Sequence, residues 1–302
     1  MQTPVDVSYV PGSLSSRENQ MFTSNPFADL PAWLSQTFMQ VYVIVMIVLV
    51  IAGTLFDVVH KKSARYFGEN MARSRSRATR DVGGGEKLGI AEKTAVVDVA
   101  TSGEFCNPRR RLAHLLTMYG FVAFVIATAL LVFRYPTTDT PAPAMLALVW
   151  HIGALMVCVG GYWFWFFIRA DVAAEGSSPF RLMRADLFVL SLLGSTTFAL
   201  LWSWAASAGS GLAGPLFGLF LLATTVLFGG VPWSKFAHMF FKPAAAFQKR
   251  VTKADGSMEN LPVIPDLSDP EVQKRYPDIP EYLGKNPPDM GLGIKREAPR
   301  HY

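Results

Sequence analysis

The sequence predicts an all-α integral membrane protein, a five-helix bundle that continues into a Pro-rich extended cytoplasmic tail. Composition is the first reason: 51% of the 302 residues are hydrophobic and 17% are charged, which is too apolar for a soluble domain of this length. The second reason is that several apolar stretches are long enough to cross roughly 30 Å of hydrocarbon as helices. These predicted spans cover residues 38–59, 112–133, 145–168, 187–206 and 212–240.

The first span follows a polar lead that has no basic n-region, so we expect it to be a retained span and not a cleaved signal peptide. The loop after it is rich in Lys and Arg, and the positive-inside rule places such a loop in the cytoplasm. Alternation of the spans then puts the N-terminus outside and the tail inside. The predicted segments are a non-cytoplasmic 1–37, a first span at 38–59, a basic cytoplasmic loop at 60–111, the remaining bundle at 112–250 and the Pro-rich cytoplasmic tail at 251–302.

Two cytoplasmic segments have a composition that suggests partners. The loop contains "RSRSRATRDVGGGEK", which we expect to be flexible and to attract either anionic lipids or a docking protein. The tail contains many prolines and one predicted short helix at "SDPEVQKRY", capped by Ser268 or Asp269 ahead of Pro270. The tail is interpreted either as an arm that lies along a soluble partner or as a disordered segment.

The histidines are the main chemical signal. His60, His114 and His238 fall near the cytoplasmic edge of predicted spans, whereas His151 lies inside the third span, nearer the outer side. Asn107 should cap the second span, because "NPRRRLAH" puts Pro108 in the first turn.

A b-type haem between helices requires imidazoles at matching depth, apolar walls, small residues for close approach, and cations near the propionates. His114 and His238 meet the depth condition as metal ligands, and Arg110 or Arg111 could bind the propionates. Gly120, Gly229 and Gly230 would allow the porphyrin to approach closely. The alternative is that these polar residues only anchor helix ends at the interface.

Other polar positions have open interpretations. Lys235 must find a carboxylate, a propionate, a quinone oxygen or water. His60 is a weaker third candidate in the sequence "HKKSAR", and His151 could be a satisfied buried histidine, a quinone contact or a second haem ligand. Gly214 and Gly218 form a GxxxG pattern that we interpret as ordinary close helix packing.

Three stretches, "RRRLAHLLTMYGFVAF", "HIGALMVCVGGYWFWFFIRAD" and "PWSKFAHMFFKPAAAFQKR", resemble the five-span cytochrome b subunits typified by the gamma subunit of respiratory nitrate reductase. The resemblance covers roughly residues 38–250. Within that group, the basic loop and Pro-rich tail are most similar to the membrane-anchor subunits of adenylylsulfate (APS) reductase. The nitrate reductase pattern has two histidines on each of two helices, whereas this chain has one on each, at His114 and His238.

The resemblance implies a bacterial inner-membrane anchor subunit that transfers electrons and does not itself perform substrate chemistry. It implies one haem b held by His114 and His238. A second haem would need His60 and His151. The implied partners are quinone and the flavin and iron–sulfur subunits of a cytoplasmic reductase, with adenylylsulfate reductase as the first candidate. We also expect the protein to contact anionic lipids and not to bind nucleic acid. The alternatives are a cofactor-free anchor and a subunit of a different quinone-linked oxidoreductase.

Overall fold

The structure is a computed structural model and is helical throughout its described residues, with no strand among them. The described residues are 21–28, 30, 34–60, 63–103, 105, 107–170, 176–234, 238–261 and 269–275. They divide into two compact units that are each formed by separate parts of the sequence. Unit 1 combines Met1–Lys61 with Leu112–His238, and unit 2 combines Lys62–Arg111 with Met239–Tyr302.

Unit 1 contains the apolar helices. Four are long and apolar enough to cross a membrane: Gln36–His60, Pro108–Arg134, Ala144–Ile168 and Arg184–Ser207. They correspond to α2 (Gln36–His60), α5 (Pro108–Arg134), α6 (Ala144–Trp163) continued by η2 (Phe164–Ile168), and η3 (Arg184–Asp186) continued by α7 (Leu187–Ser207). The predicted all-helical fold is confirmed for the described residues, and the four long apolar helices are compatible with the predicted membrane bundle. The first four predicted spans match these helices closely.

The fifth predicted span, 212–240, does not form one helix. Its apolar part forms α8 (Ala213–Gly229), which has 17 residues, and the chain then turns through η4 (Val231–Trp233). Consecutive glycines and Pro232 explain the break, because glycine destabilises a helix interior and proline lacks the N–H that a helix needs. His238 is therefore the first residue of the next helix, α9 (His238–Ala254), and not the last of the fifth span.

Aromatic residues form the core of unit 1. Phe27 and Phe217 are both 0% exposed, and Trp202 lies between them with ring-centroid distances of 5.2 Å and 4.6 Å. Phe27 comes from the N-terminal lead, which is held by a hydrogen bond of 2.7 Å from Asn25 Nδ2 to the Tyr135 carbonyl, just beyond the end of α5. The polar lead therefore contributes an aromatic side chain to the bundle, which its composition does not indicate.

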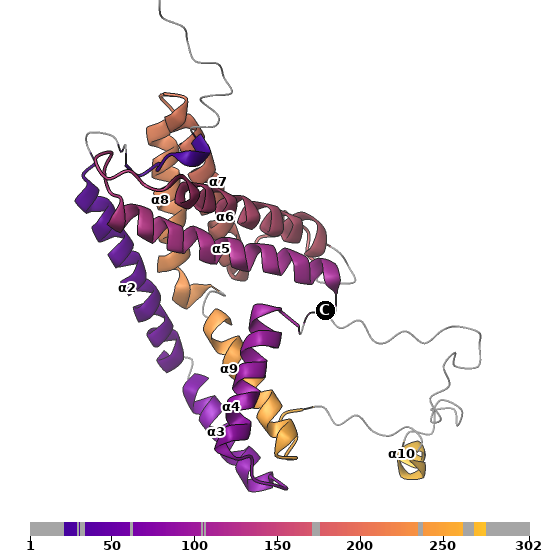
Figure 1. Cartoon of the computed structure of the whole chain (residues 1–302). Coiled ribbons are helices and arrows are strands. Elements are labelled where there is room, and N and C mark those ends of the chain that lie inside the picture. Colours follow the sequence, from indigo (N-terminus) through magenta and orange to yellow (C-terminus); the bar gives the residue numbers. More distant parts are fainter. Residues whose placement is uncertain are drawn as a thin grey trace, which may run out of the picture. The chain divides into compact units, whose positions relative to one another are not determined.

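Helices α5 and α6 pack backbone to backbone, side by side in Figure 1. A Cβ on Gly120 would lie 2.7 Å from the Gly153 carbonyl oxygen, and one on Gly160 would lie 2.6 Å from the Ala113 carbonyl oxygen. Small residues permit this close approach, the usual basis of helix association in membranes. The expectation that Gly120 admits a porphyrin is wrong, because α6 occupies that space.

Hydroxyl groups connect the other helices of unit 1. Ser195 of α7 and Thr224 of α8 share a hydrogen bond of 2.7 Å, and Tyr42 of α2 donates to the Leu221 carbonyl of α8 at 2.9 Å. The interpretation of Gly214 and Gly218 as a packing motif is not borne out. A Cβ on either would meet no atom within 4 Å, so neither glycine is needed for close packing on the chain as described.

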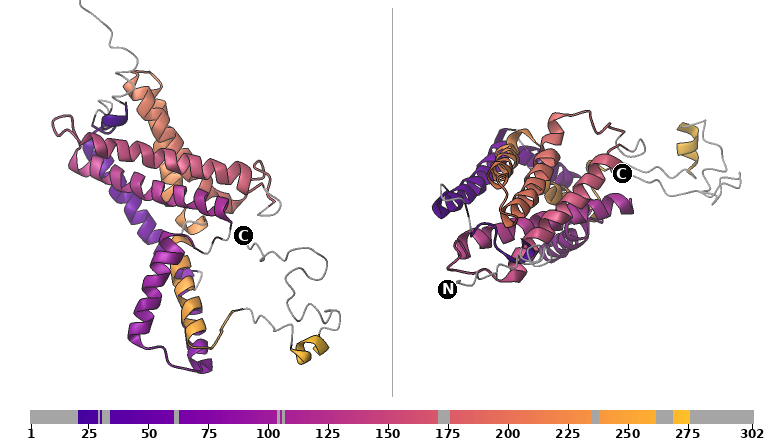
Figure 2. Two further views of the ribbon diagram at one scale, coloured as in Figure 1. Left: turned by 45° about the vertical axis from the view of Figure 1, so that its right-hand side comes forward. Right: turned by 90° about the horizontal axis from the view of Figure 1, so that it is seen from above.

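Unit 2 is built from the basic loop and the segment after α8. Its helices are α3 (Ser63–Arg77), α4 (Gly84–Lys93), the π-helical η1 (Thr94–Ala100), most of α9, and the short α10 (Pro270–Arg275). Figures 1 and 2 show α9 running alongside α3 and α4. Asp269 caps α10 by accepting a hydrogen bond of 3.0 Å from the Glu271 N–H, which confirms one of the two predicted caps.

The segment that we expect to be flexible forms the end of α3 and the start of α4, joined by residues 78–83. It is ordered because α9 and the turn after it satisfy its polar groups. Arg77 donates to Glu259 at 2.8 Å, and Ser74 donates to Asp255 at 2.7 Å. The backbone N–H of Thr79 donates to the Asp255 carbonyl at 2.9 Å. The alternating Arg and Ser residues therefore put cations and hydroxyls on a helix face that meets acidic residues more than 170 positions later in the chain.

Candidate functional site

His151 lies in the core of unit 1 and both of its ring nitrogens are engaged. Nδ1 is 2.8 Å from the Ala147 carbonyl oxygen, and Nε2 is 2.8 Å from Ser203 Oγ. The ring is 0% exposed and meets Trp150 edge-on at 4.8 Å. A role as a haem ligand would require one of these hydrogen bonds to break. The geometry matches a buried histidine whose two ring nitrogens are both hydrogen-bonded, which is one of the interpretations that the sequence left open.

His60 and His114 lie on different helices of unit 1. His60, the last residue of α2, is exposed and its ring stacks on Phe56 at 5.1 Å. His114 is partly buried and lies seven residues before Phe121, two turns along the same face of α5. Phe121 contacts Phe228, the penultimate residue of α8, at a ring distance of 6.3 Å. The α5 face that carries His114 is thus directed, two turns further on, toward the end of α8.

The other two residues of the predicted haem and quinone site cannot be placed in the same way. His238 begins α9, but its side chain is not among those described. Lys235 lies outside the described residues. The pairing of His114 with His238 therefore stays a prediction.

The arginines assigned to haem propionates belong to unit 2 and have contacts there. The Arg110 guanidinium lies 5.7 Å from the Phe105 ring centroid, and Lys242 lies 5.3 Å from the same ring. Arg111 Nε donates to the Thr101 carbonyl at 2.7 Å, at the end of η1. Cations stabilise helix carboxyl ends in this way. Asn107 Oδ1 accepts from the Arg109 N–H at 2.9 Å, which confirms the predicted cap of α5.

Sequence reasoning missed Asp57, a carboxylate within the apolar helix α2. Asp57 is 3% exposed and lies one turn beyond Gly53 on the buried face of that helix. A Cβ on Gly53 would lie 3.0 Å from Val231 Cβ, so this face of α2 packs against η4. An acid inside an apolar span was the signal that could have identified it, since charge is costly in hydrocarbon.

A second missed feature is an ion pair in the segment between α6 and α7. Arg169 is 1% exposed and its Nη2 lies 2.6 Å from Asp186 Oδ2. The same guanidinium donates to the carbonyls of Ser178 and Arg181, both at 2.8 Å, and lies 4.2 Å from the Trp165 ring centroid. This pair organises a connecting loop, and both of its charged groups are hydrogen-bonded, as burial of a charge requires.

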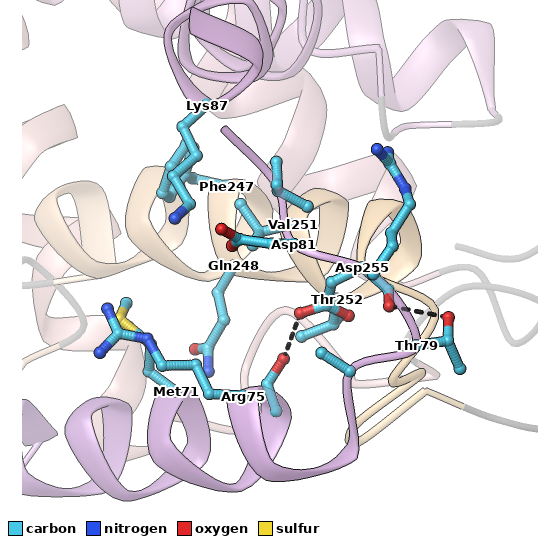
Figure 3. Close-up of a pocket in the computed structure, with 14 residues that line it drawn as sticks. Met71, Arg75, Thr79, Asp81, Lys87, Phe247, Gln248, Val251, Thr252 and Asp255 are labelled. Atoms are coloured by element: carbon cyan, nitrogen blue, oxygen red, sulfur yellow. Dashed lines mark hydrogen bonds between the residues drawn. The ribbon is translucent and has the colours of Figure 1, made fainter. Parts of the chain in front are cut away.

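Unit 2 contains a pocket of about 590 Å³ between α3, the segment after it, and α9. Apolar side chains of Met71, Phe247 and Val251 form part of its wall. Figure 3 shows Arg75 of α3 and Lys87 of α4 on two sides of the space, with Gln248 of α9 beside Arg75. The volume is in the range of small-ligand sites, which combine apolar walls with a few polar groups.

Among the described residues, some of the charged side chains around this pocket already have ion-pair or hydrogen-bond partners, and others do not. Arg80 pairs with Glu86 and also donates to the Ala254 carbonyl at 2.6 Å. Asp255 accepts from Ser74, and although burial opposes ionisation, hydrogen bonds from Ser257 and Ser74 lower its pKa. Within the described part of the chain, Arg75 and Lys87 make no ion pair and no side-chain hydrogen bond. These two cations are therefore available to a ligand.

The described residues hold no group of three or more His, Cys, Asp or Glu side chains arranged for a metal ion. Comparison of the chain with protein-family models, with curated proteins and with solved structures found no match.

Proposed function

We propose that the protein is a membrane-anchor subunit that holds a cytoplasmic redox enzyme at the bacterial inner membrane. Four long apolar helices support the membrane part of this proposal. The observation that carries the anchor role is unit 2, a folded and basic helical unit made from the loop between the first two spans and the segment after α8. Residues 62–111 contain 11 Lys and Arg against 6 Asp and Glu, and residues 239–261 contain 4 against 2.

A folded unit of this kind suits protein docking better than a flexible basic loop would, because its surface is ordered before the partner binds. The net positive charge favours an acidic partner surface and would speed association. The resemblance to cytochrome b anchor subunits makes adenylylsulfate reductase the first candidate partner. In that case the soluble enzyme oxidises sulfite with AMP, and the electrons pass to quinone.

The test is reconstitution of the purified protein in lipid vesicles with the soluble reductase of the same organism. We expect the reductase to sediment with vesicles that carry the protein and to stay in solution with empty vesicles. Retention should weaken in high salt, since exposed charges are screened. A reductase that stays in solution in both cases would contradict this partner assignment.

Haem binding is a second, separable part of the proposal. It is supported by the partly buried His114 and by the α5 face that meets α8 at Phe121. The described surroundings do not supply the rest of the expected site, because Gly120 packs on α6 and Arg111 caps η1. A haem would contribute one-electron transfer between the soluble enzyme and quinone when bound. His114 would be the ligand that this part of the chain provides.

A reduced-minus-oxidised optical spectrum of the purified protein tests this part directly. If haem b is bound, the spectrum shows its absorption bands, and His114→Ala and His238→Ala each remove them. His60→Ala is the control, because His60 is exposed at the end of α2 and stacks on Phe56. Absence of the bands after expression with ample haem would leave the cofactor-free anchor.

A further inference from the structure

We infer that the pocket between α3 and α9 binds an acidic peptide segment of the soluble partner, with apolar residues of that segment against the pocket wall. The inference rests on the proposed function, since it names the part of unit 2 that the partner recognises. The pocket has room for a few side chains, at about 590 Å³. Its lining combines apolar side chains with cations from two different helices.

The charge pattern points to this pocket in particular. In the described part of unit 2, five arginines already form ion pairs within the unit. The pairs are Arg65 with Glu69, Arg73 and Arg77 with Glu259, Arg80 with Glu86, and Arg250 with Asp98. Arg75 comes from the same helix as three of these and has no such partner within the described residues. A carboxylate from a partner protein could form with Arg75 the same kind of ion pair that the other arginines form within unit 2.

The apolar part of the pocket lining favours a peptide over an anion alone. Met71 is 42% exposed although it lies beside Arg75 in the lining, and Phe247 and Val251 are partly buried. An apolar surface of this kind gains from contact with Leu or Phe side chains, whereas a small hydrophilic anion would leave it in water. The Gln248 amide can donate to and accept from a peptide backbone. An acidic segment with one or two large apolar residues therefore matches all three kinds of lining group.

Asp81 lies in the same lining and limits what can bind. A strongly acidic run would meet this carboxylate and be repelled, so the pocket should prefer one or two acids next to large apolar residues over a polyacidic tract. This preference separates specific recognition from general attraction to a basic surface.

The experiment measures fluorescence anisotropy of a labelled peptide in which two glutamates flank a leucine and a phenylalanine. The full-length protein is used in nanodiscs of neutral lipid. We expect binding that weakens in high salt and that falls at least about tenfold in the double variant Arg75→Glu/Lys87→Glu, since two attractions become repulsions. The control, Lys93→Glu/Lys253→Glu, makes the same change in net charge on exposed residues outside the pocket lining. Its effect should stay within about threefold.

Equal losses in the two double variants would overturn the inference, because they would show general electrostatic attraction. Equal binding of a peptide with glutamines in place of its glutamates would also overturn it. The inference would also be overturned if the peptide no longer bound the wild-type protein in nanodiscs of anionic lipid, because that result would assign the pocket to lipid headgroups. The reductase sedimentation described above is a separate readout. Its failure alone would reject that partner, whereas failure of peptide binding with intact sedimentation would reject the pocket.

Discussion

Arg250 of α9 and Asp98 of η1 are joined by two hydrogen bonds, from Nε to Oδ2 at 2.6 Å and from Nη2 to Oδ1 at 2.8 Å. The two residues are 152 positions apart in sequence, and the bidentate geometry connects the loop half of unit 2 to its C-terminal half. Such paired, charge-assisted bonds are stronger than single neutral ones.

Removing this pair should loosen unit 2. We expect Asp98→Asn to lower the stability of the unit by about 1–2 kcal/mol, because a partly buried charge-assisted bond is lost. Limited trypsin digestion should then cut the basic loop faster. The control is Glu69→Gln, whose partner Arg65 is 72% exposed and which should change the cutting rate little. Equal rates in wild type and Asp98→Asn would contradict the prediction.

The same pair should respond to acid. Hydrogen bonding from Arg250 lowers the pKa of Asp98 below its ordinary value. A carboxyl whose folded pKa is depressed adds stability above its unfolded pKa of about 4, and this contribution disappears as the pH falls through the lower folded pKa. The difference in digestion rate between wild type and Asp98→Asn should therefore be full at about pH 6 and shrink below about pH 4. An acid-stable protease is needed at the lower pH.

The position of a truncation should decide whether unit 2 survives. Asp255 and Glu259 hold α3 through Ser74 and Arg77, so they belong to the unit and not to the tail. A chain that ends at Leu261 should keep the loop resistant to trypsin, whereas a chain that ends at Lys253 should lose that resistance. If both truncations behave alike, these contacts do not order the loop.

The close contact of α5 with α6 should make its glycines sensitive to substitution. Gly120→Ala puts a Cβ 2.7 Å from the Gly153 carbonyl oxygen, so the helices must separate, at a cost of about 1–3 kcal/mol. Gly218→Ala is the control, because a Cβ there meets nothing within 4 Å and alanine favours a helix. Thermal stability in detergent should fall for the first and hold or rise for the second.

Arg169 should be among the most sensitive positions in the connection between α6 and α7. Arg169→Ala leaves Asp186 buried without its cation and should destabilise the unit by about 3–5 kcal/mol. Arg169→Lys should recover only part of this loss, since lysine cannot reach Asp186 and two carbonyls in the same planar arrangement. Arg184→Ala, at an exposed position, is the matched control in detergent melting.

The His151 pair can be tested by a single hydroxyl deletion. Ser203→Ala should leave His151 Nε2 buried without its partner and cost about 1–3 kcal/mol. Ser207→Ala on the same helix removes an exposed hydroxyl and should be close to neutral. The Ser203 variant should keep whatever haem spectrum wild type has. A lost spectrum with unchanged stability would instead return His151 to the set of cofactor ligands.

Local features could be predicted from the sequence because they depend on neighbouring residues. The caps at Asn107 and Asp269 each use a side chain and a backbone N–H two positions later. The lengths of the first four spans follow from the length of each apolar run. The fifth span was predicted too long because hydropathy alone does not register the helix break at Gly230 and Pro232.

The contact partners of several residues were decided only by the tertiary structure. Gly120 faces α6, Ser203 meets His151 from 52 positions away, and Arg77 meets Glu259 from 182 positions away. Each of these contacts requires two distant segments to fold together, and a composition or spacing argument cannot name the second segment. The sequence by itself therefore determined that the chain is helical, with four helices long and apolar enough to cross a membrane and a basic loop after the first. Tertiary packing decided that the loop is an ordered unit, because the groups that satisfy its charges lie near the far end of the chain.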